Sequence, residues 1–280
     1  MTSREDEVWF ITGSSSGFGR ELVLEALAQG ARVVATARDP RVLAELVTRA
    51  PERVLALGLD VTRADQIERA VAAAYERFGA IDVLVNNAGY SLVGAVEETS
   101  DHELRSAFDT MFFGVASLTR AVLPKMRERG SGTIVQITSM GGVMTAPGYG
   151  PYCAVKHAVE GYSEALASEV APLGIRVLIV EPGAFRTGLF GSAFRSMPEL
   201  PAYDATVGPV RRYASDVAGK QPGDPRKAAS AIVQSVAAGA PQLRLPLGAD
   251  AVMAMRAKLA QVVADIGANE ATAAATAFTE

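Results

Sequence analysis

The sequence predicts an α/β fold in a single domain, with helices on both faces of a doubly wound, parallel, seven-stranded sheet. Short apolar runs alternate with helical periods between residues 8 and 266, and this alternation is typical of parallel strands joined by right-handed crossovers. The chain has 280 residues, of which 49% are hydrophobic and 21% are charged. It is therefore long enough to bury one large core.

The first strand and the turn after it begin this alternation. Val8–Ile11 is an uninterrupted apolar tetrad, which is typical of a strand covered on both faces. A glycine-rich turn follows, and Arg20–Gln29 has the apolar spacing of a helix. A helix N-terminus offers unpaired N–H groups and a partial positive charge, which suit a pyrophosphate. Residues 8–29 therefore predict a nucleotide site.

Each of the three glycines in this turn has its own expected role. We expect Gly13 to make the tight turn, Gly17 to let the backbone approach phosphate, and Gly19 to let the helix pack closely on the strand. The hydroxyls of Ser14–Ser16 are available to phosphate oxygens. Glycines also end strands for steric reasons alone, so the motifs farther along the chain decide between the two explanations.

The later elements continue the pattern in order. Further strands are predicted at residues 32–36, 54–59, 82–85, 133–137, 175–180 and 242–246. Helices are predicted at residues 62–78, 100–129, 152–171, 225–237 and 250–266, and a shorter one begins at Asp39–Pro40. The signals for helix starts include Thr62 with Asp65 and Ser100 with Glu103. Doubly wound sheets bind ligands at the carboxyl ends of their strands, so we expect the site along that edge.

Three segments fall outside the alternation. Residues 1–7 are predicted to form a flexible N-terminus, and residues 267–280 a frayed C-terminal tail. Residues 184–224 show no sustained period, and we expect a mobile lid or a short helical insertion there. This segment contains large hydrophobic residues, namely Phe185, Phe190, Phe194, Met197 and Tyr203.

These hydrophobic residues favour a bulky, mostly apolar substrate. We expect such a substrate to enter beside Met140 and Gly141 and to contact Phe185 and Phe190. Alternatively, the same side chains seal the core or an interface between subunits.

The composition disfavours several classes of function. The net charge is −4 with both signs scattered along the chain, so nucleic acid is not an expected partner. No run of about 18 apolar residues would span a membrane. The single cysteine, Cys153, allows no internal disulfide and fits a reducing cytoplasm. His102 and His157 have no partners at metal-binding spacing, so no metal is expected.

Three residues carry the expected chemistry. Tyr152 and Lys156 lie four apart near a helix start and share one face. A phenol has a pKa of about 10, and a neighbouring ammonium favours its anion, which allows proton exchange with an alcohol or a carbonyl. Ser139 ends a strand, where its hydroxyl could donate to the same oxygen. A solvated pair and a serine that satisfies the strand end are the ordinary alternatives.

Six motifs in sequence order resemble those of the classical short-chain dehydrogenases/reductases, over about residues 8–247. They are TGSSSGFG at 12–19, Asp60–Val61, NNAG at 86–89, Ser139, YCAVK at 152–156, and Pro182–Gly183 with Thr187. The resemblance implies a Rossmann-like fold that acts with a nicotinamide dinucleotide on an alcohol or a carbonyl. It also implies that Tyr152 transfers the proton, while Ser139 orients the substrate oxygen. Lys156 would hold the nicotinamide ribose and lower the tyrosine pKa.

The same resemblance distributes the dinucleotide contacts. Asp60 would bind the adenine and Asn87–Gly89 the adenosine ribose, whereas Asn86 is interpreted as structural. The residues after the sixth strand would meet the nicotinamide end. The complete set of expected dinucleotide contacts is Gly13, Ser15, Ser16, Gly17, Phe18, Gly19, Arg38, Asp60, Val61, Asn87, Ala88, Gly89, Tyr152, Lys156, Pro182, Gly183 and Thr187.

The end of the second strand predicts NADP(H) rather than NAD(H). An NAD site of this kind places a carboxylate there to bind the ribose 2′-hydroxyl, but this chain has Ala37 followed by Arg38. A guanidinium binds a phosphate through two N–H groups and stacks on adenine. Alternatively, Arg38 is a surface residue paired with Asp39.

One position departs from the family pattern. The family usually has an asparagine in a stretch resembling FDVNLFG, which would help to seat a water beside the catalytic lysine, and this chain has Met111. A thioether cannot supply the amide's donors, although Met111 also fits the apolar face of its helix.

The leading hypothesis is an NADP(H)-dependent oxidoreductase that interconverts a secondary alcohol and a ketone. A dinucleotide-binding regulator with weak turnover, and an epimerase or dehydratase on the same fold, are the alternatives. The family resemblance further implies a homodimer or a homotetramer.

Overall fold

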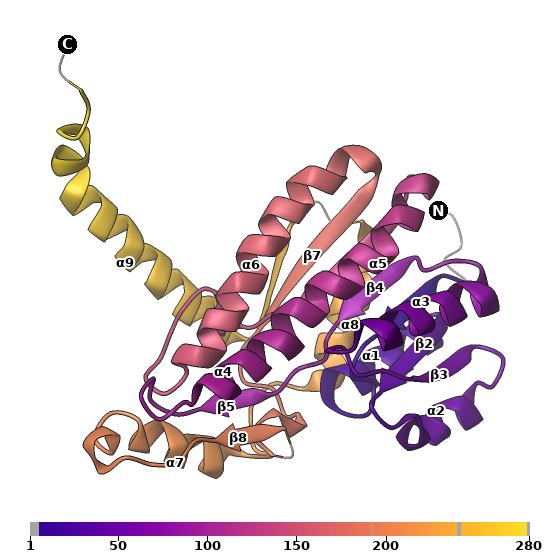
Figure 1. The fold of residues 1–280 in the computed structure, drawn as a ribbon, viewed down its shortest axis with the longest axis horizontal. Helices are drawn as coiled ribbons and strands as arrows, with labels where there is room; N and C mark the ends of the chain where they lie inside the picture. The colour runs from indigo at the N-terminus through magenta and orange to yellow at the C-terminus, as the bar shows by residue number, and fades with distance from the viewer. Residues whose placement is uncertain (1–5, 192, 240–241, 279–280) are drawn as a thin grey trace.

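A parallel sheet of seven strands runs through the molecule (Figure 1), in the order β3-β2-β1-β4-β6-β7-β9. The computed structural model describes residues 6–191, 193–239 and 242–278, so most of the predicted N-terminal segment 1–7 lies outside the described residues. The strands of this sheet are β1 Val8–Ile11, β2 Arg32–Ala37, β3 Val54–Gly58, β4 Val83–Asn86, β6 Gly132–Ile137, β7 Ile175–Pro182 and β9 Arg244–Leu247. The predicted doubly wound fold is therefore confirmed.

Helices cover both faces of this sheet. The helices are α1 Gly17–Ala28, α2 Ala44–Arg49, α3 Ala64–Phe78, α4 Asp101–Phe108, α5 Gly114–Arg129, α6 Gly150–Val170, α7 Gly208–Val217, α8 Pro225–Ala238 and α9 Ala249–Ala274. One apolar cluster packs α1, α2 and α8 on the first face, and a second packs α3, α5 and α6 on the other. Two cores on one sheet explain why its central strands are apolar throughout.

Strand β1 shows how the sequence builds both cores. Trp9 and Ile11 pack in the first cluster, while Val8 and Phe10 pack in the second. Each of these side chains is 2% exposed or less. The strand lies between β2 and β4, where the strand order reverses, so the glycine turn at its end opens at the ligand-binding crevice of the fold.

The predicted helix starts are mostly correct. Asp39 accepts a hydrogen bond from the Arg41 N–H at 3.0 Å, and Ser100 accepts one from the Glu103 N–H at 3.2 Å. The prediction at Thr62 is wrong, because α3 begins two residues later, at Ala64. The hydroxyl and N–H of Thr62 instead bond to a preceding carboxylate.

The predicted helix over 100–129 is interrupted. A π-helical turn at Asp109–Phe113 separates α4 from α5. Two short strands that the sequence did not indicate, β5 (Ser91–Val93) and β8 (Phe194–Ser196), pair in a separate parallel sheet. With α7, strand β8 gives regular structure to part of the aperiodic segment 184–224.

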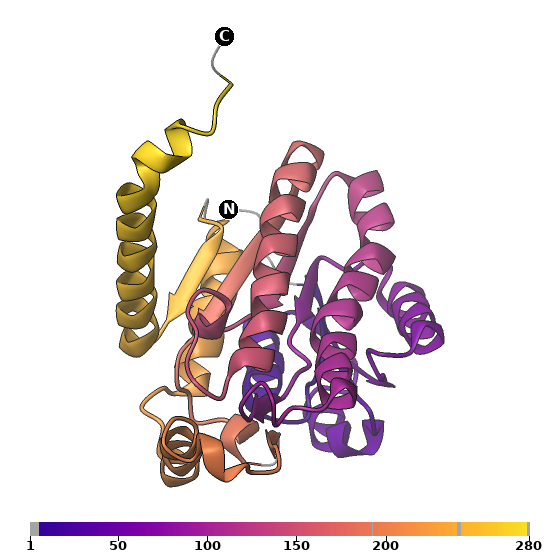
Figure 2. The same ribbon diagram turned by 60° about the vertical axis from the view of Figure 1, so that its left-hand side comes forward.

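The last helix is longer than the sequence predicted. α9 continues to Ala274, so most of the segment expected to fray, 267–280, is helical. Alanine has the highest helix propensity, and this segment is rich in it. The helix stands apart from the sheet and the helices that cover it (Figures 1 and 2), and its buried residues lie in its first two turns.

Candidate active site

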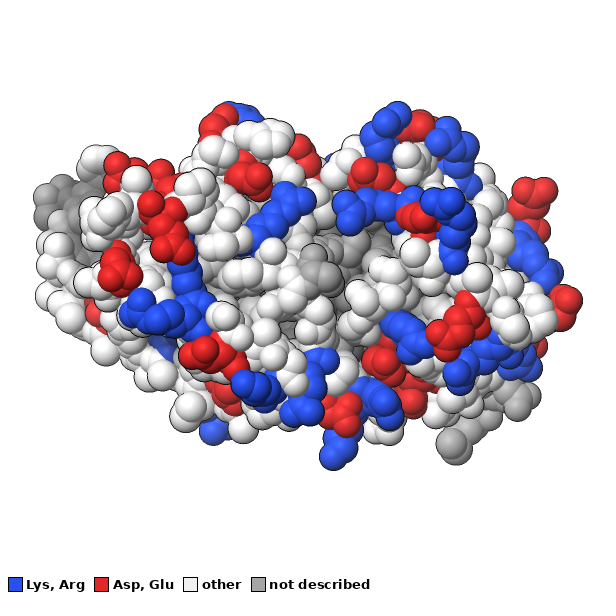
Figure 3. Space-filling model, turned by 90° about the horizontal axis from the view of Figure 1, so that it is seen from below, with Lys and Arg blue, Asp and Glu red and all other residues white. Residues whose placement is uncertain are grey.

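A cavity of about 640 Å³ lies along the carboxyl edge of the sheet, at the switch point where doubly wound sheets bind ligands. Its walls come from the loops after β1, β2, β3, β4, β6 and β7. The molecule seen from below is hollowed near its centre, with charges of both signs around the hollow (Figure 3). Ligand sites typically enclose about 300–1,000 Å³, so this cavity has the volume for a dinucleotide end and a substrate.

The glycine turn forms one wall of the cavity. Gly13 and Gly17 have φ angles of +68° and +52°, a region that other residues rarely adopt. A side chain at Gly19 would overlap the carbonyl oxygen of Gly13. Gly19 therefore lies behind the wall, where it lets α1 begin close against the turn.

The serines of this turn have two different roles. Ser15 and Ser16 line the cavity, and the Ser16 side chain makes no capping hydrogen bond. Ser14 is fully buried. Its hydroxyl donates to the Ile11 carbonyl at 2.9 Å and accepts from the Thr36 N–H at 3.2 Å. The prediction that Ser14 offers its hydroxyl to phosphate is therefore wrong, because that hydroxyl links β1 to β2.

The loops after β3 and β4 form the next part of the wall. The predicted residues that line it are Asp60, Val61, Asn87, Ala88 and Gly89. The Asp60 carboxylate accepts hydrogen bonds from the N–H of Thr62 at 2.9 Å and from its hydroxyl at 2.8 Å. The Asn87 amide donates to the Thr12 carbonyl at 2.8 Å. Asn86 instead points into the core, as expected of a structural residue.

The end of β2 brings a cation to the cavity. Arg38 lines it, and within the described part of the chain no hydrogen bond or ion pair engages the Arg38 side chain. The neighbouring Asp39 pairs instead with Arg41, whose Nε and Nη2 lie 2.9 and 2.8 Å from its carboxylate oxygens. This pairing holds the pKa of Asp39 below its ordinary value. The alternative in which Arg38 pairs with Asp39 is not observed.

The predicted catalytic residues meet at the cavity. Ser139 follows β6, while Tyr152 and Lys156 lie on α6. The side chains of Tyr152 and Lys156 are largely withdrawn from water, at 7% exposure for each residue. Lys156 Nζ donates to the Ile137 carbonyl at 3.0 Å and lies 5.7 Å from the centre of the Tyr152 ring. The Ser139 side chain is a hydrogen-bonding neighbour of the phenol.

Burial shifts the pKa values of this pair in opposite directions. It raises the pKa of Tyr152 to about 12, although the hydrogen bond with Ser139 acts to lower it. It lowers the pKa of Lys156 to about 8, and the carboxylate of Glu160 opposes that shift. Because desolvation disfavours charge, the phenol keeps its proton, and the ammonium titrates close to neutral pH. Such shifts in a cavity are typical of acid–base sites.

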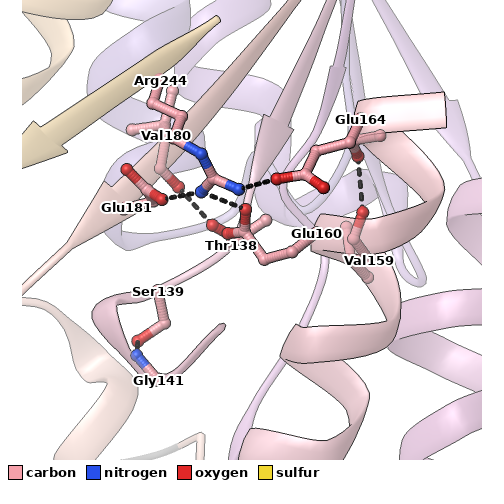
Figure 4. A network of polar contacts seen from close by, with 10 residues as sticks. Thr138, Ser139, Gly141, Val159, Glu160, Glu164, Val180, Glu181 and Arg244 are labelled. Carbon is pink, nitrogen blue, oxygen red and sulfur yellow. Dashed lines mark hydrogen bonds and ion pairs between the residues drawn. The ribbon is translucent and has the colours of Figure 1, made fainter. Parts of the chain in front are cut away.

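A network of charged side chains joins α6, β7 and β9 (Figure 4). Glu160 follows on the next turn of α6, and Glu181 lies near the end of β7; they are 4% and 0% exposed. Arg244 of β9 contacts both carboxylates, at 2.7 Å from Glu160, and also contacts Glu164. Burial, together with the charge of Glu160, raises the pKa of Glu181 to about 7. No sequence pattern indicated this network, apart from a glutamate one helical turn after the lysine.

The loop after β7 closes the cavity beside the catalytic residues. The predicted residues Pro182, Gly183 and Thr187 line it. Asp250, at the start of α9, accepts a hydrogen bond from the Ala184 N–H at 2.7 Å. A side chain at Gly183 would run into the Asp250 carboxylate, so the glycine is required where the loop meets α9.

Comparison with known proteins agrees with this geometry. Residues 7–198 match the family model described as short chain dehydrogenase. The chain belongs to the short chain dehydrogenase family. It is an oxidoreductase of that family, and the resemblance inferred from six motifs is confirmed.

Several known proteins are similar to this chain over nearly their full length. A crystal structure of a short-chain dehydrogenase from Streptomyces avermitilis is 48% identical, with a TM-score of 0.93 over 98% of this chain and 100% of that one. An oxidoreductase of Botryotinia fuckeliana is 40% identical over 88% of this chain and 90% of its own length. A 3-ketodihydrosphingosine reductase of Bacteroides thetaiotaomicron is 37% identical over 87% of this chain and 88% of its own length.

The substrate end of this short chain dehydrogenase differs in part from the prediction. Phe185 and Phe190 line the cavity, and Phe185 packs edge-on against Phe18 with ring centres 5.1 Å apart. Met140 and Gly141 are not among the residues that line it. The Gly141 N–H donates to the Ser139 hydroxyl oxygen at 3.0 Å, so the turn that they form positions the serine, and their contact with a substrate stays a prediction.

The predicted lid consists of two parts with different environments. Thr187, Leu189 and Phe190 border the cavity. Farther along, Met197 is 6% exposed and packs in a third apolar cluster. The Glu98 carboxylate anchors this second part through the Leu200 N–H at 2.8 Å and the Arg211 guanidinium at 2.7 Å. The core-sealing alternative is therefore correct for Met197.

Several residues that line the cavity were not predicted. They include Tyr90, Ser106, Thr110, Leu189, Ala193 and Arg195. Tyr90 directly follows the NNAG motif, so its position was a usable signal. Arg195 lies 4.0 Å above the Tyr90 ring, and the pairing of β5 with β8 brings it there. No local pattern predicts that pairing.

Met111 lies within the π-helical turn and is 1% exposed. It packs with Tyr152 in the third apolar cluster and fills the space beside Gly89, where an added side chain would come within 3.1 Å of its sulfur. The packing role expected of Met111 is therefore observed. It sits in a distorted turn, whose main-chain carbonyl groups depart from the α-helical hydrogen-bond pattern.

Among the described residues there is no group of three or more side chains suited to holding a metal ion. Within the same residues, no helix has the length and apolar character needed to span a bilayer.

Proposed function

We propose that this short chain dehydrogenase is an NADP(H)-dependent oxidoreductase that interconverts a secondary alcohol and a ketone on a bulky, mostly apolar substrate. The observation that carries the proposal is the convergence of the glycine turn and the residues Ser139, Tyr152 and Lys156 on one cavity. A phosphate-binding turn and an acid–base set in one cavity serve a redox reaction in which a proton accompanies a hydride.

The residues present fit a dinucleotide. The glycine turn leaves room for phosphates at the start of α1, and the Ser16 hydroxyl is free of capping bonds. Asp60 and Asn87 are held by hydrogen bonds where an adenosine would lie. The reductase of Brucella melitensis, which is 27% identical with a TM-score of 0.73, was crystallised with NADH, and this supports a nicotinamide cofactor here.

The charge at the end of β2 supports a 2′-phosphate. Arg38 lines the cavity, and the carboxylate beside it in the sequence, that of Asp39, is paired with Arg41. A guanidinium binds a phosphate in a bidentate manner. An unpaired carboxylate at the same place would favour a ribose hydroxyl instead.

The catalytic residues then have distinct tasks. A bound nicotinamide supplies or accepts the hydride. The neutral Tyr152 phenol is poised to donate its proton to the carbonyl oxygen during reduction, and Ser139 is placed to donate a hydrogen bond to the same oxygen. The Lys156 ammonium, held at the Ile137 carbonyl, stabilises the phenolate that the transfer leaves.

The apolar substrate class rests on the cavity wall and on relatives. Leu189, Phe190 and Ala193 give that wall its apolar character beside the catalytic end. The Bacteroides thetaiotaomicron relative reduces, by its name, 3-ketodihydrosphingosine. The Brucella melitensis protein is by its name a 3-ketoacyl-(acyl-carrier-protein) reductase. Both names describe reduction of a keto group.

Cofactor choice is tested by fluorescence titration of the Arg38→Leu variant with NADPH and with NADH. The loss of a charge-assisted hydrogen bond should cost about 1.5–3 kcal/mol of NADPH binding. NADH affinity is the internal control and should be unchanged. Equal NADPH affinity in the variant and the native protein would refute the role of Arg38.

Reaction class is tested by NADPH consumption with ketones of graded size and polarity. Bulky apolar ketones should be reduced with a higher kcat/KM than small polar carbonyls, and the reverse order would contradict the substrate proposal. Tight NADPH binding without turnover of any ketone would favour the regulator or the epimerase and dehydratase alternatives.

A further inference from the structure

Helix α9 is attached to the molecule at one end. Ala251 and Met255 are buried, and Asp250 bonds to the loop after β7. Beyond Met255, no described residue of the helix is buried. In proteins most helical stability comes from packing of an apolar face against other elements, and the outer part of α9 lacks that packing.

This outer part carries an apolar stripe. Leu259, Val263 and Ile266 are 53%, 69% and 66% exposed, and their spacing of four and three residues places them on one face. Arg256 and Glu270 continue the same face at either end. Within the described residues, no ion pair engages either charge. Clustered apolar side chains in water, unlike single ones, mark an interaction surface.

We propose that the α9 face from Arg256 to Glu270 binds the same face of a second copy of this chain, antiparallel about a two-fold axis at Val263. A two-fold interface must be self-complementary, and the charges of this face meet that condition. Arg256 and Glu270 each lie seven residues from Val263. Antiparallel pairing therefore places Arg256 against Glu270 of the partner subunit, and the two-fold axis repeats this ion pair on its other side.

The sizes of the side chains are complementary in the same register. Leu259 and Gly267 each lie four residues from Val263, so Leu259 faces the partner's Gly267. Nothing lies within 4 Å of a Cβ added at Gly267, and glycine is unfavourable inside a helix. A large side chain against a glycine lets two helices approach closely, which gives this glycine a packing role.

In this register the parts of the two subunits outside α9 stay apart. Val263 lies eight residues beyond Met255, which is about 12 Å along a helix at 1.5 Å per residue. Each body then lies about that distance from the axis, and each helix end reaches the first turns of the partner's α9.

The charges of α9 argue against a lipid surface. The helix has three acidic residues and two basic ones, namely Asp250, Asp265, Glu270, Arg256 and Lys258. Helices that lie on membranes are rich in Lys and Arg on their polar face. A face with one basic end and one acidic end is complementary to the same face of an antiparallel second copy, and less so to a lipid surface.

The first experiment measures mass by sedimentation velocity on the full chain and on Val263→Glu. The substitution places two carboxylates together at the axis, so the dissociation constant should rise by at least about 100-fold. Met253→Glu is the matched control, because Met253 is 70% exposed on the same helix but lies about 80° around the helix axis from Val263. The control should dissociate as the native chain does.

The second experiment tests the register. Arg256→Glu and Glu270→Arg should each weaken association, and the double exchange should restore it, which distinguishes direct pairing from loss of helix. A short bis-maleimide should cross-link Val263→Cys but not Met253→Cys, since the native Cys153 is buried. A native chain that stays monomeric, or an oligomer unchanged by Val263→Glu, would overturn the proposal. Recruitment to anionic vesicles through Val263 without self-association would also overturn it.

Discussion

The two long helices α6 and α9 invert the usual distribution of side chains in different ways. Helix α6 buries groups that normally face water, including Tyr152, Lys156 and Glu160. Helix α9 exposes groups that normally face a core, including Val263 and Ile266. Both arrangements cost stability in the isolated chain, through desolvation of charge in α6 and hydration of apolar surface in α9.

The inversions point to different kinds of function. A buried charge is tolerated where it is paired, as Glu160 is with Arg244, and its altered pKa is what acid–base chemistry uses. An exposed apolar stripe becomes favourable once a partner covers it. Variants on α6 should therefore change rate and pH dependence without changing mass, and variants on the outer part of α9 should change mass without changing the rate per site.

The largest effect is expected for Tyr152→Phe. Without the phenol oxygen there is no positioned proton donor, so turnover of a reducible ketone should fall by at least about 100-fold. NADPH affinity should change by less than about twofold, since the ring is retained. Steady-state rates and cofactor titration measure both. Survival of more than a few per cent of the rate would require a different proton donor, while Val263→Glu should keep its rate.

The next effect concerns stability and the buried carboxylate of Glu181. Its pKa in the folded protein is about 7, above the ordinary value of about 4.3, so between those values the folded protein binds a proton that the unfolded chain releases. The free energy of unfolding should then fall as pH rises through this window, by up to about 3 kcal/mol. Denaturant unfolding of Glu181→Gln should lack this slope.

Glu164→Gln is the matched control for that experiment, because Glu164 contacts the same arginine but its side chain is 54% exposed. It should keep the slope of the native protein. If Glu181→Gln also kept the slope, another group would take up the proton, and the Glu181 carboxylate of β7 would be ionised in the folded state.

A smaller effect is expected for Glu160→Gln in the pH profile. The pKa of Lys156 is about 8, so at lower pH this side chain carries the charge that stabilises the phenolate. The carboxylate of Glu160 acts to raise that pKa. Its removal should lower the pKa of Lys156, so that ketone reduction is lost at a pH about one unit lower on the alkaline side. Glu169→Gln, on the exposed side of α6, should leave the profile in place. A rate loss that is uniform with pH would indicate a purely structural role.

The smallest effect is expected for Met111→Asn. If a main-chain carbonyl of the π-helical turn can hold the water that passes protons from Lys156, the side chain matters little. The rate should then stay within about threefold, or about 0.6 kcal/mol of barrier. Transient and steady-state rates of the variant measure this. A gain on the order of 100-fold would show that the native relay is impaired and would favour the regulator alternative.

The sequence by itself determined the features that depend on near neighbours along the chain. Apolar runs such as Val8–Ile11 predicted the strands of the main sheet, because a strand buried on both faces must be apolar throughout. The glycine turn and the spacing of Tyr152 and Lys156 identified the two halves of the site, because a tight turn and one helix face are set by local geometry. The ends of elements were less accurate, as α3 and α9 show.

Only the tertiary structure decided which distant residues meet. Glu160, Glu181 and Arg244 come from one helix and two strands that lie far apart in the sequence, and the crossover connections bring them together. The pairing of β5 with β8 likewise brings Arg195 to the cavity. Sequence periodicity reports which face of an element is buried, but it does not report what lies opposite that face. Hence Ser14 was predicted to reach phosphate, although its hydroxyl bonds between two strands.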